Sequence, residues 1–387
     1  MVDSPFPPST ATPGDGRIVA ALTPNGEPGL AVVSYQYPLK LIAPQTGAGL
    51  GTLNGGGQDG DSTRRKSALV FLLSYGGGLV AGDQVNLAIE VQRGARLSLV
   101  TQGTTKVFKA TGDGREAPVT VPTRQNLTMT VAPGAGLCLL PDPVQPFAES
   151  LYEQLQVVRL DEKVGGGNGD GTLPSLCLLD WVTQGRAARG ENWSFTSWKG
   201  RNEVWIETGG SGGGGGDDDD NIMPPRNRLL VRDAVMLAGG YLDGVVFPET
   251  VLRDSLQGLA VFGTLILRGP LVDALGLFFM CEFDALPRLG GRDFRDAKDM
   301  VVPIPAAAAA SATATDTFLS LEAWRAERLR LEQMHGVLWS AAAVRGCVVV
   351  KFGARSIEGG RLWIGAMLQR EGSVAAAFGD EALMCVR

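Results

Sequence analysis

Gly76, Gly78 and Ala81 have the G-x-G-x-x-A spacing of a loop that binds the pyrophosphate of a dinucleotide. Such a loop opens a helix whose N-terminus holds the phosphates. Here the residues after the loop are instead apolar at every second position from 85 to 91, which is the period of a strand. The sequence therefore favours a tight turn between two strands, and a nucleotide-binding enzyme that uses the Gly76 to Gly82 loop is the alternative.

Carboxylates are the next groups that could do chemistry. Asp180 lies near Glu191 in the sequence, and Glu203 lies near Glu207. Paired carboxylates serve as acid and base in glycoside hydrolysis. Such pairs at strand ends are more often surface features, and Arg186 between the first two residues favours a salt bridge instead.

The chain has a single histidine, His335, and five cysteines with no C-x-x-C pair. Imidazole and thiolate are the side chains that hold nickel or zinc firmly. One histidine cannot build a multi-histidine metal centre, and a serine–histidine–acid triad could use only His335. That residue precedes Gly336 at the end of a predicted helix, where a structural role is expected. The unpaired cysteines suit a reducing compartment.

The 387 residues are 44% hydrophobic and carry a formal net charge of −6. This composition suits one large or two medium domains with a full core. The chain lacks the clustered basic residues typical of nucleic-acid binding. It also lacks a secretory signal pattern and any apolar stretch long enough for a membrane span. We expect a cytoplasmic protein with no nucleic-acid partner and no membrane partner.

Short apolar segments separated by Gly or Pro predict a mainly β fold with layered sheets. The expected strands are 31–40, 68–73, 84–91, 96–101, 127–131, 137–140, 151–160, 175–183, 192–198, 203–207, 229–236, 259–267, 337–344 and 347–352. A few α-helices are expected, mostly in the C-terminal third, at 271–286, 318–334 and 360–369.

The domain organisation is predicted from composition. Residues 1–29 are expected to form a disordered N-terminal segment, and residues 30–387 a single β-rich domain. Stretches of low complexity predict flexible insertions in that domain, near 47–66, 161–172, 208–225 and 288–316.

Several motifs together resemble the urease accessory protein UreD (UreH) family over much of the chain. In order they are Gly77-Gly78-Leu79-Val80-Ala81-Gly82-Asp83, Gly94-Ala95, Thr101-Gln102-Gly103-Thr104-Thr105-Lys106, Gly185-Arg186 with Gly190-Glu191-Asn192-Trp193, and Arg232-Asp233. Each motif alone is weak, but their order makes the match specific. The insertions depart from the shorter family pattern and suggest a fungal member.

The resemblance implies a β-rich, solenoid-like body and a protein that is not an enzyme. Proteins of this family form complexes with UreF and UreG, contact the urease apoprotein and assist nickel delivery to the urease active site. The family is thought to carry an internal, water-filled passage for nickel. The resemblance therefore implies no tightly bound cofactor, with nickel only in transit. The scarcity of histidine agrees, because a conduit must release its ion. A β-rich structural or carbohydrate-binding module is a further alternative.

Polar residues at or near the matching motifs become candidates for a transient nickel passage: Asp83, Thr101, Thr105, Asp142, Asp180 and Glu191. Each also has a structural interpretation. Asp83 would fix the Gly-rich turn, the threonines would be strand-edge hydroxyls, and Asp142 would be a turn residue between two prolines. Asp180 and Glu191 would pair with neighbouring arginines.

The late helices are the expected partner surface, because C-terminal elements of the family contact UreF. Aromatic and large apolar side chains are enriched at interface centres. The candidate anchors are Phe318, Trp324, Leu331, Trp339 and Trp363. Ordinary core packing is the alternative for each of them.

Overall fold

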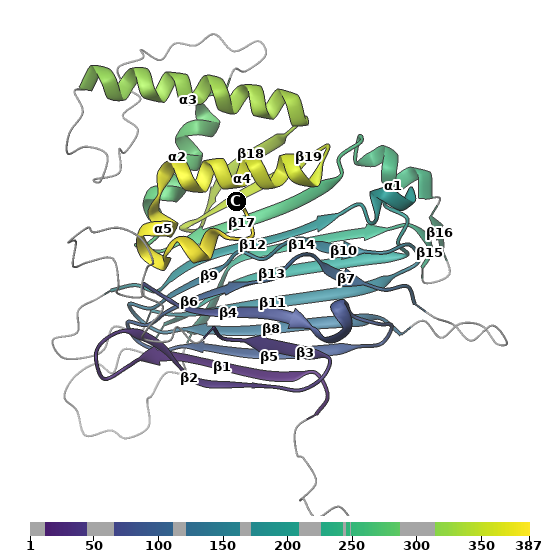
Figure 1. Cartoon of the computed structure of the whole chain (residues 1–387), viewed down its shortest axis with the longest axis horizontal. Helices are drawn as coiled ribbons and strands as arrows, with labels where there is room; N and C mark the ends of the chain where they lie inside the picture. The colour runs from purple at the N-terminus through teal and green to yellow at the C-terminus, as the bar shows by residue number, and fades with distance from the viewer. Residues whose placement is uncertain are drawn as a thin grey trace, which may run out of the picture.

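The computed structural model describes residues 12–44, 66–110, 121–162, 172–208, 226–242, 245–247, 249–286 and 314–387. Most of these residues belong to two large sheets, and the longer helices lie in the C-terminal part of the chain (Figure 1). The predicted mainly β fold class is confirmed.

The first sheet, sheet A, has seven strands. Their spatial order is β14 (Arg226–Ala238), β13 (Ser197–Thr208), β11 (Leu151–Asp161), β8 (Thr123–Val131), β5 (Gln84–Val91), β1 (Asp15–Leu22) and β2 (Pro28–Tyr35). The five central strands, from β13 to β1, run parallel, and the two edge strands are antiparallel to their neighbours.

The second sheet, sheet B, follows a main path of eight strands. They are β18 (Leu338–Val344), β19 (Cys347–Ala354), β17 (Val261–Arg268), β12 (Ser175–Thr183), β9 (Gly136–Leu139), β6 (Arg96–Val100), β4 (Ala68–Ser74) and β3 (Leu39–Ile42). Two short strands, β7 (Thr105–Val107) and β10 (Val144–Pro146), pair beside β12 and extend this sheet at one end.

Between β4 and β13 the chain passes repeatedly from sheet B to sheet A, as in a β-solenoid. The strands β4, β6, β9 and β12 are parallel, so their carboxyl ends share one edge of sheet B. The connections that leave these four strands therefore stack side by side, on the side of the molecule where β7 and β10 lie (Figure 1). We call this the crossover edge. It collects sequence motifs that are far apart along the chain.

Alternating residues of both sheets meet in an apolar core, with Leu87, Leu127 and Leu178 among its buried members. The other face of sheet B carries a second core under the helices α2 (Asp273–Asp284), α4 (Ile357–Glu371) and α5 (Ser373–Phe378). The helix α3 (Ala314–His335) packs against α4. The remaining elements are the short helix α1 (Glu249–Ser255), the hairpin of β15 (Gly240–Leu242) and β16 (Val245–Phe247), and the 3-10 turns η1 (Tyr75–Gly77), η2 (Ala187–Arg189) and η3 (Asp380–Leu383).

Several sequence predictions need correction. The N-terminal boundary at residue 29 was too late, because β1 begins at Asp15 and its apolar residues enter the core between β2 and β5. The strand expected at 192–198 begins only at Ser197. The strands β7 and β10 and the helix α5 were not predicted, because each is very short. Most residues of the four predicted insertions lie outside the described residues.

The Gly-rich turn is not a nucleotide loop, because strand β5 follows it in place of a helix. Gly76, Gly77 and Gly82 have positive φ angles of 70°, 78° and 83°, a region that glycine enters without strain. Gly78 is needed for a different reason: a Cβ atom there would lie 2.5 Å from the Phe108 ring and 2.9 Å from a backbone oxygen. These glycines therefore shape a turn that packs closely on the next connection.

Candidate functional site

A row of buried polar side chains crosses the apolar core between the two sheets, close to the crossover edge. Its members are Gln154, Gln156, Asp180, Asn202 and Asp233, and each is at most 9% exposed. We call this row the polar seam. Since isolated polar groups are costly to bury, a continuous row of them in an otherwise apolar core calls for a functional explanation.

The pleat of the strands explains how the polar seam forms. In β11, every second residue from Tyr152 faces the core, so Gln154 and Gln156 point inward. Gln156 is in register with Asn202 of β13, which is in register with Asp233 of β14. The polar side chains therefore line up across neighbouring strands, along the axis of the solenoid.

Asp180 is the central carboxylate of the polar seam and comes from sheet B. It accepts hydrogen bonds of 2.8 Å from the amide groups of Gln154 and Asn202. Among the described residues, no Lys or Arg forms an ion pair with it. Burial raises the pKa of Asp180, and the hydrogen bonds from Asn202 and Gln154 oppose that rise. Asp180 is therefore a buried acid that is held by amides and not by a base.

Two carbonyl oxygens beside Asp180 have no hydrogen-bond partner among the described residues. They are Oδ1 of Asn202 and Oε1 of Gln156, and both are buried. A buried acceptor without a donor is unfavourable unless another group satisfies it. One carboxylate with two carbonyl oxygens is a donor set that suits a divalent cation without the firm grip of imidazole or thiolate.

An internal cavity of about 30 Å³ adjoins this part of the polar seam. Its lining includes Thr101, Thr105, Asp142 and Asp180, which are four of the six residues that the sequence suggested for a nickel passage. A second cavity, of about 10 Å³, shares Thr105 with the first and continues to Ser74 at the start of the Gly-rich turn. A space of this size holds about one water molecule. The crossover edge thus brings four predicted residues together around one small polar space.

Asp142 forms one end of this polar space. Its Oδ2 accepts hydrogen bonds from the Thr101 hydroxyl at 3.0 Å and from the Gly103 amide at 2.9 Å. Thr101 also accepts a 2.7 Å bond from the Asp142 amide. Arg361, from α4, donates to Oδ1 of Asp142 at 2.6 Å. Both oxygens of this carboxylate are therefore engaged.

Cysteine is an unsuitable ligand at this end of the space. Cys385 donates to the backbone oxygen of Thr101 at 3.3 Å, and burial raises the pKa of Cys385 to about 11. A thiol with that pKa stays protonated near neutral pH and is a poor metal ligand. Among the described residues, His, Cys, Asp and Glu form no group of three or more that could hold a metal ion.

Asp233 lies at the other end of the polar seam, on the edge strand β14. Lys351, from β19, donates to Oδ1 of Asp233 at 2.5 Å and lies 3.5 Å from the Thr264 hydroxyl. The Lys351 side chain is 39% exposed and that of Asp233 is 10% exposed. A partly exposed base therefore reaches in from the surface to a buried acid.

Asp83 and Glu191 do not line the two cavities. Asp83 accepts a 2.8 Å bond from the Val80 amide and holds the Gly-rich turn, as its structural interpretation anticipated. Glu191 accepts bonds of 2.8 Å from the backbone amide and the Nε of Arg186. It forms the predicted salt bridge, but Asp180 takes no part in it.

The candidate interface residues mostly pack on the second core. Trp363 is fully buried, and Trp324, Leu331 and Trp339 are half-buried against the same cluster. Trp363 is therefore a core residue and not a surface anchor. The side chain of Phe318 lies outside the described residues.

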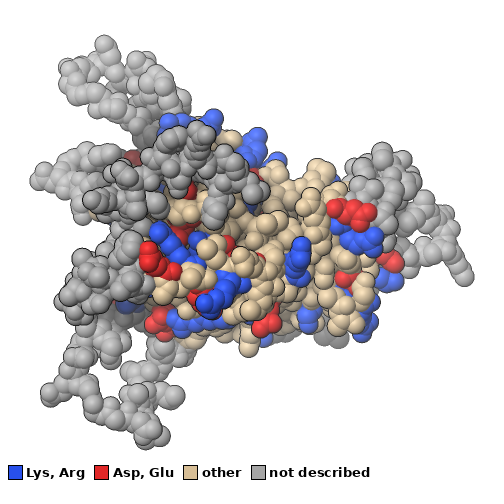
Figure 2. Space-filling view, turned by 90° about the horizontal axis from the view of Figure 1, so that it is seen from above, with Lys and Arg blue, Asp and Glu red and all other residues tan. Residues whose placement is uncertain are grey.

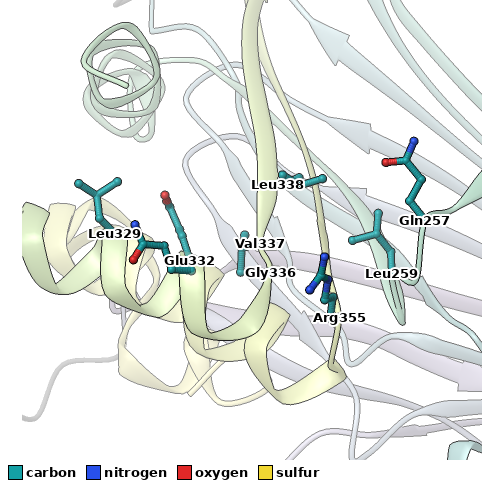
Figure 3. Close-up of a pocket in the computed structure, with 9 residues that line it drawn as sticks. Gln257, Leu259, Leu329, Glu332, Gly336, Val337, Leu338 and Arg355 are labelled. Carbon is teal, nitrogen blue, oxygen red and sulfur yellow. The ribbon is translucent and has the colours of Figure 1, made fainter. Parts of the chain in front are cut away.

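A surface groove of about 350 Å³ lies beside the end of α3. Leu329 and Glu332 line it from the helix, Val337 and Leu338 from the following segment, and Leu259 from the turn before β17 (Figure 3). Leu338 is 62% exposed, and the nearby helix residue Met334 is 77% exposed. Seen from the helix side, the described surface also has a broad area without charged side chains (Figure 2). This region is the best candidate for a partner surface.

Part of the polar seam was not predicted from the sequence. Asp233 appeared only within a motif and without a role, and Gln154, Gln156, Asn202 and Lys351 were not predicted at all. Signals were present: Gln154 and Gln156 interrupt the otherwise apolar inward face of their strand, and Lys351 is a lone charge after Cys347-Val348-Val349-Val350. The contacts among these residues depend on strand pairing and were not visible in the sequence.

The described chain is thus a β-solenoid with a polar seam through its core, covered on one side by helices. The model of the family described as UreD urease accessory protein matches residues 14–385. The chain belongs to this family.

Individual relatives agree with the family match. A urease accessory protein ureD-like chain of Schizosaccharomyces pombe is 27% identical over 331 residues, which cover 84% of this chain and 83% of the relative. Urease accessory protein 4 of Cryptococcus neoformans is 34% identical over 50% of this chain and 57% of its own length. A urease accessory protein UreD of Anaeromyxobacter is 30% identical over 70% of each chain. In the described part of this chain, no helix combines the length and apolarity that a membrane crossing requires.

Proposed function

We propose that this protein is a non-catalytic scaffold for urease maturation and that it assists nickel delivery through the polar seam. The single observation that carries the proposal is the buried Asp180 with two unsatisfied carbonyl oxygens beside it. These groups offer oxygen ligands to a cation in passage. The family membership supports the wider role in urease maturation.

The chemistry of the polar seam suits transfer better than storage. Ni²⁺ binds firmly to clustered imidazoles or thiolates, whereas oxygen ligands hold it weakly. A conduit requires sites that are shallow enough for the ion to leave. Asp142, Asp180 and Asp233 supply three carboxylates, and amide and hydroxyl side chains lie near them. Nickel is the cargo in this proposal, and the protein keeps no resident cofactor.

The route would run along the solenoid axis. It would start at Asp233 between the edge strand β14 and β19, pass Asp180, and continue past Asp142 and Thr105 to the cavity near Ser74. Both ends of this line approach the surface beside different elements. This arrangement would let one partner load the ion at one end while the urease apoprotein receives it at the other.

The partners in this proposal are UreF, UreG and the urease apoprotein, in the cytoplasm. The groove beside α3 is the proposed docking surface for UreF, because its lining is largely apolar and large apolar side chains stand exposed next to it. We expect Leu338→Asp to weaken co-purification of UreF about ten-fold. Leu277→Asp, at an exposed leucine of α2 away from this lining, is the matched control and should leave co-purification unchanged.

A maturation assay tests the proposed route. Urease apoprotein is matured in cells with Asp180→Asn in place of the native chain, and the nickel content of the purified urease is measured. We expect nickel to fall about ten-fold, since the central charge is lost. Glu153→Gln is the control, because Glu153 is a neighbouring carboxylate of β11 on the outer face of sheet A. Normal nickel content with Asp180→Asn would remove the polar seam from the route.

A further inference from the structure

Among the described residues, the two outer carboxylates of the proposed nickel route each pair with a basic side chain, while the central one does not. Arg361 pairs with Asp142, with 2.6 Å between Nη2 and Oδ1. Lys351 pairs with Asp233 at 2.5 Å. Asp180 has only amide partners among the residues described. We propose that Lys351 and Arg361 are blocking cations, which occupy the positions where a divalent ion would bind and keep the resting affinity of the route low. This inference rests on the proposed function, since it takes the route to carry a divalent cation.

Burial separates the acids from the bases in both pairs. The side chains of Asp142 and Asp233 are 5% and 10% exposed, whereas those of Arg361 and Lys351 are 32% and 39% exposed. The acids are thus fixed inside, and the bases reach them along flexible stems from the surface. A basic side chain can therefore move out to water by rotation about its own bonds, whereas the acid cannot follow it.

The geometry at Asp142 shows why the base must leave before a cation enters. Oδ2 already accepts hydrogen bonds from Thr101 and Gly103, so only Oδ1 could bind an ion, and Arg361 occupies it. At the other end, Lys351 lies on Oδ1 of Asp233 and also 5.5 Å above the Phe262 ring. A positive side chain at each place also repels an approaching cation.

The blocking cations therefore set selectivity as well as affinity. A monovalent ion gains little by replacing an ammonium or a guanidinium group on one carboxylate. A divalent ion is attracted more strongly to the same carboxylate. It is bound still more strongly where Asp180 and the neighbouring carbonyl oxygens also coordinate it. Release is favoured in turn, because the basic side chain returns to the acid when the ion moves on.

Equilibrium dialysis of the full-length protein against Ni²⁺ alone tests the inference. We expect Lys351→Met/Arg361→Met to bind Ni²⁺ about ten-fold more tightly than the native chain. Lys351→Arg should keep the native affinity, because it keeps the charge. Lys199→Met is the matched control: Lys199 pairs with Glu153 at 3.3 Å on the outer face and is 33% exposed. Adding Asp180→Asn to the double variant should remove most of the gain.

Folding of the variants is followed by thermal melting. Lys351→Gln keeps a hydrogen-bond donor toward Asp233. It replaces Lys351→Met in the binding measurement if the double methionine variant does not fold. A folded variant without these charges that binds Ni²⁺ no better than the native chain would overturn the inference. That result would leave the proposed route intact as long as Asp180→Asn still yields nickel-poor urease. Full nickel loading with Asp180→Asn would instead refute the route itself.

Discussion

Two of the clusters in which the described chain buries charged groups balance charge differently. Under α3, Glu282 and Glu332 meet Arg325 and Arg328, so two acids face two bases. The indole nitrogens of Trp339 and Trp363 also donate to Glu332, at 2.9 and 3.0 Å. We call these residues the helix-layer network. Its charges cancel within the chain.

The proposed nickel route between the sheets lacks this balance. Among the described residues, its three carboxylates, Asp142, Asp180 and Asp233, form ion pairs with two bases, and both bases are partly exposed. A compensated buried network stabilises the packing of α3 on the body. In the proposed function, the under-compensated network leaves a place for a cation from outside. Variants in each region test this contrast.

Breaking the helix-layer network should have the largest effect on stability. Glu282 is fully buried and pairs with Arg325 at 2.7 Å and with Arg328 at 3.5 Å. Glu282→Gln leaves both arginines without their shared acid, and we expect the free energy of unfolding to fall by about 3 kcal/mol. Denaturant titration measures this change. Glu327→Gln removes an exposed pair with Arg330 on α3 and should cost less than about 0.5 kcal/mol.

At the Asp142 end of the route, Thr101→Val should have an intermediate effect. The hydroxyl of Thr101 both donates to the Asp142 carboxylate and accepts from the Asp142 amide. Without it, a buried amide loses its partner, so we expect a loss of about 2 kcal/mol in the free energy of unfolding. Thr101→Ser keeps the hydroxyl and should recover most of that loss in the same titration.

Asp180→Asn should raise the free energy of unfolding, whereas the two variants above should lower it. The size of this increase depends on pH. The pKa of Asp180 is raised in the folded state, chiefly by burial, so the folded protein holds this proton more firmly than the unfolded chain does. The ionised carboxylate therefore costs stability as the pH rises from the unfolded pKa through the folded pKa. The variant lacks this cost.

Unfolding measured at several pH values checks the sign of this effect. The stability of Asp180→Asn relative to the native chain should increase from about pH 4 upward and then level off above the folded pKa. A relative stability that decreases over this range would show that interactions in the folded protein fully offset the cost of burying the ionised native carboxylate. That outcome would contradict the contrast between the two regions.

Trp339→Phe should have the smallest effect on stability among these core variants. It removes one of the two indole donors to Glu332, and Arg328 and Trp363 stay bound to that carboxylate. We expect a loss of about 1 kcal/mol, measured by thermal and denaturant unfolding. A loss as large as that of Glu282→Gln would mean that the indole, and not the charge balance, holds the network together.

Much of the fold was predictable because strand periodicity is a local signal. The alternation at 84–91 identified β5, and the same signal excluded a nucleotide loop. β1 was missed because its run Ile18 to Leu22 lies just after a Pro- and Gly-rich start that suggested disorder. Very short strands such as β7 gain their pairing from neighbours and have almost no signal of their own.

The candidate site was predictable only in part. Thr101, Thr105, Asp142 and Asp180 lie near motifs that the solenoid stacks at one edge, so the sequence alone named four residues that the structure brings to one cavity. The pair of Lys351 and Asp233 joins residues 118 positions apart, and no local pattern connects them. Their role depends on which strands are neighbours, and this follows from the whole topology.

In the proposed function, the polar seam carries nickel, whereas the helix-layer network only stabilises the fold. The most direct test compares nickel per urease active site after maturation with Asp180→Asn and with Trp339→Phe. The account predicts nickel-poor urease with the well-folded Asp180→Asn chain and normal loading with the slightly destabilised Trp339→Phe chain. Normal loading with Asp180→Asn, or an equal loss with both variants, would contradict it.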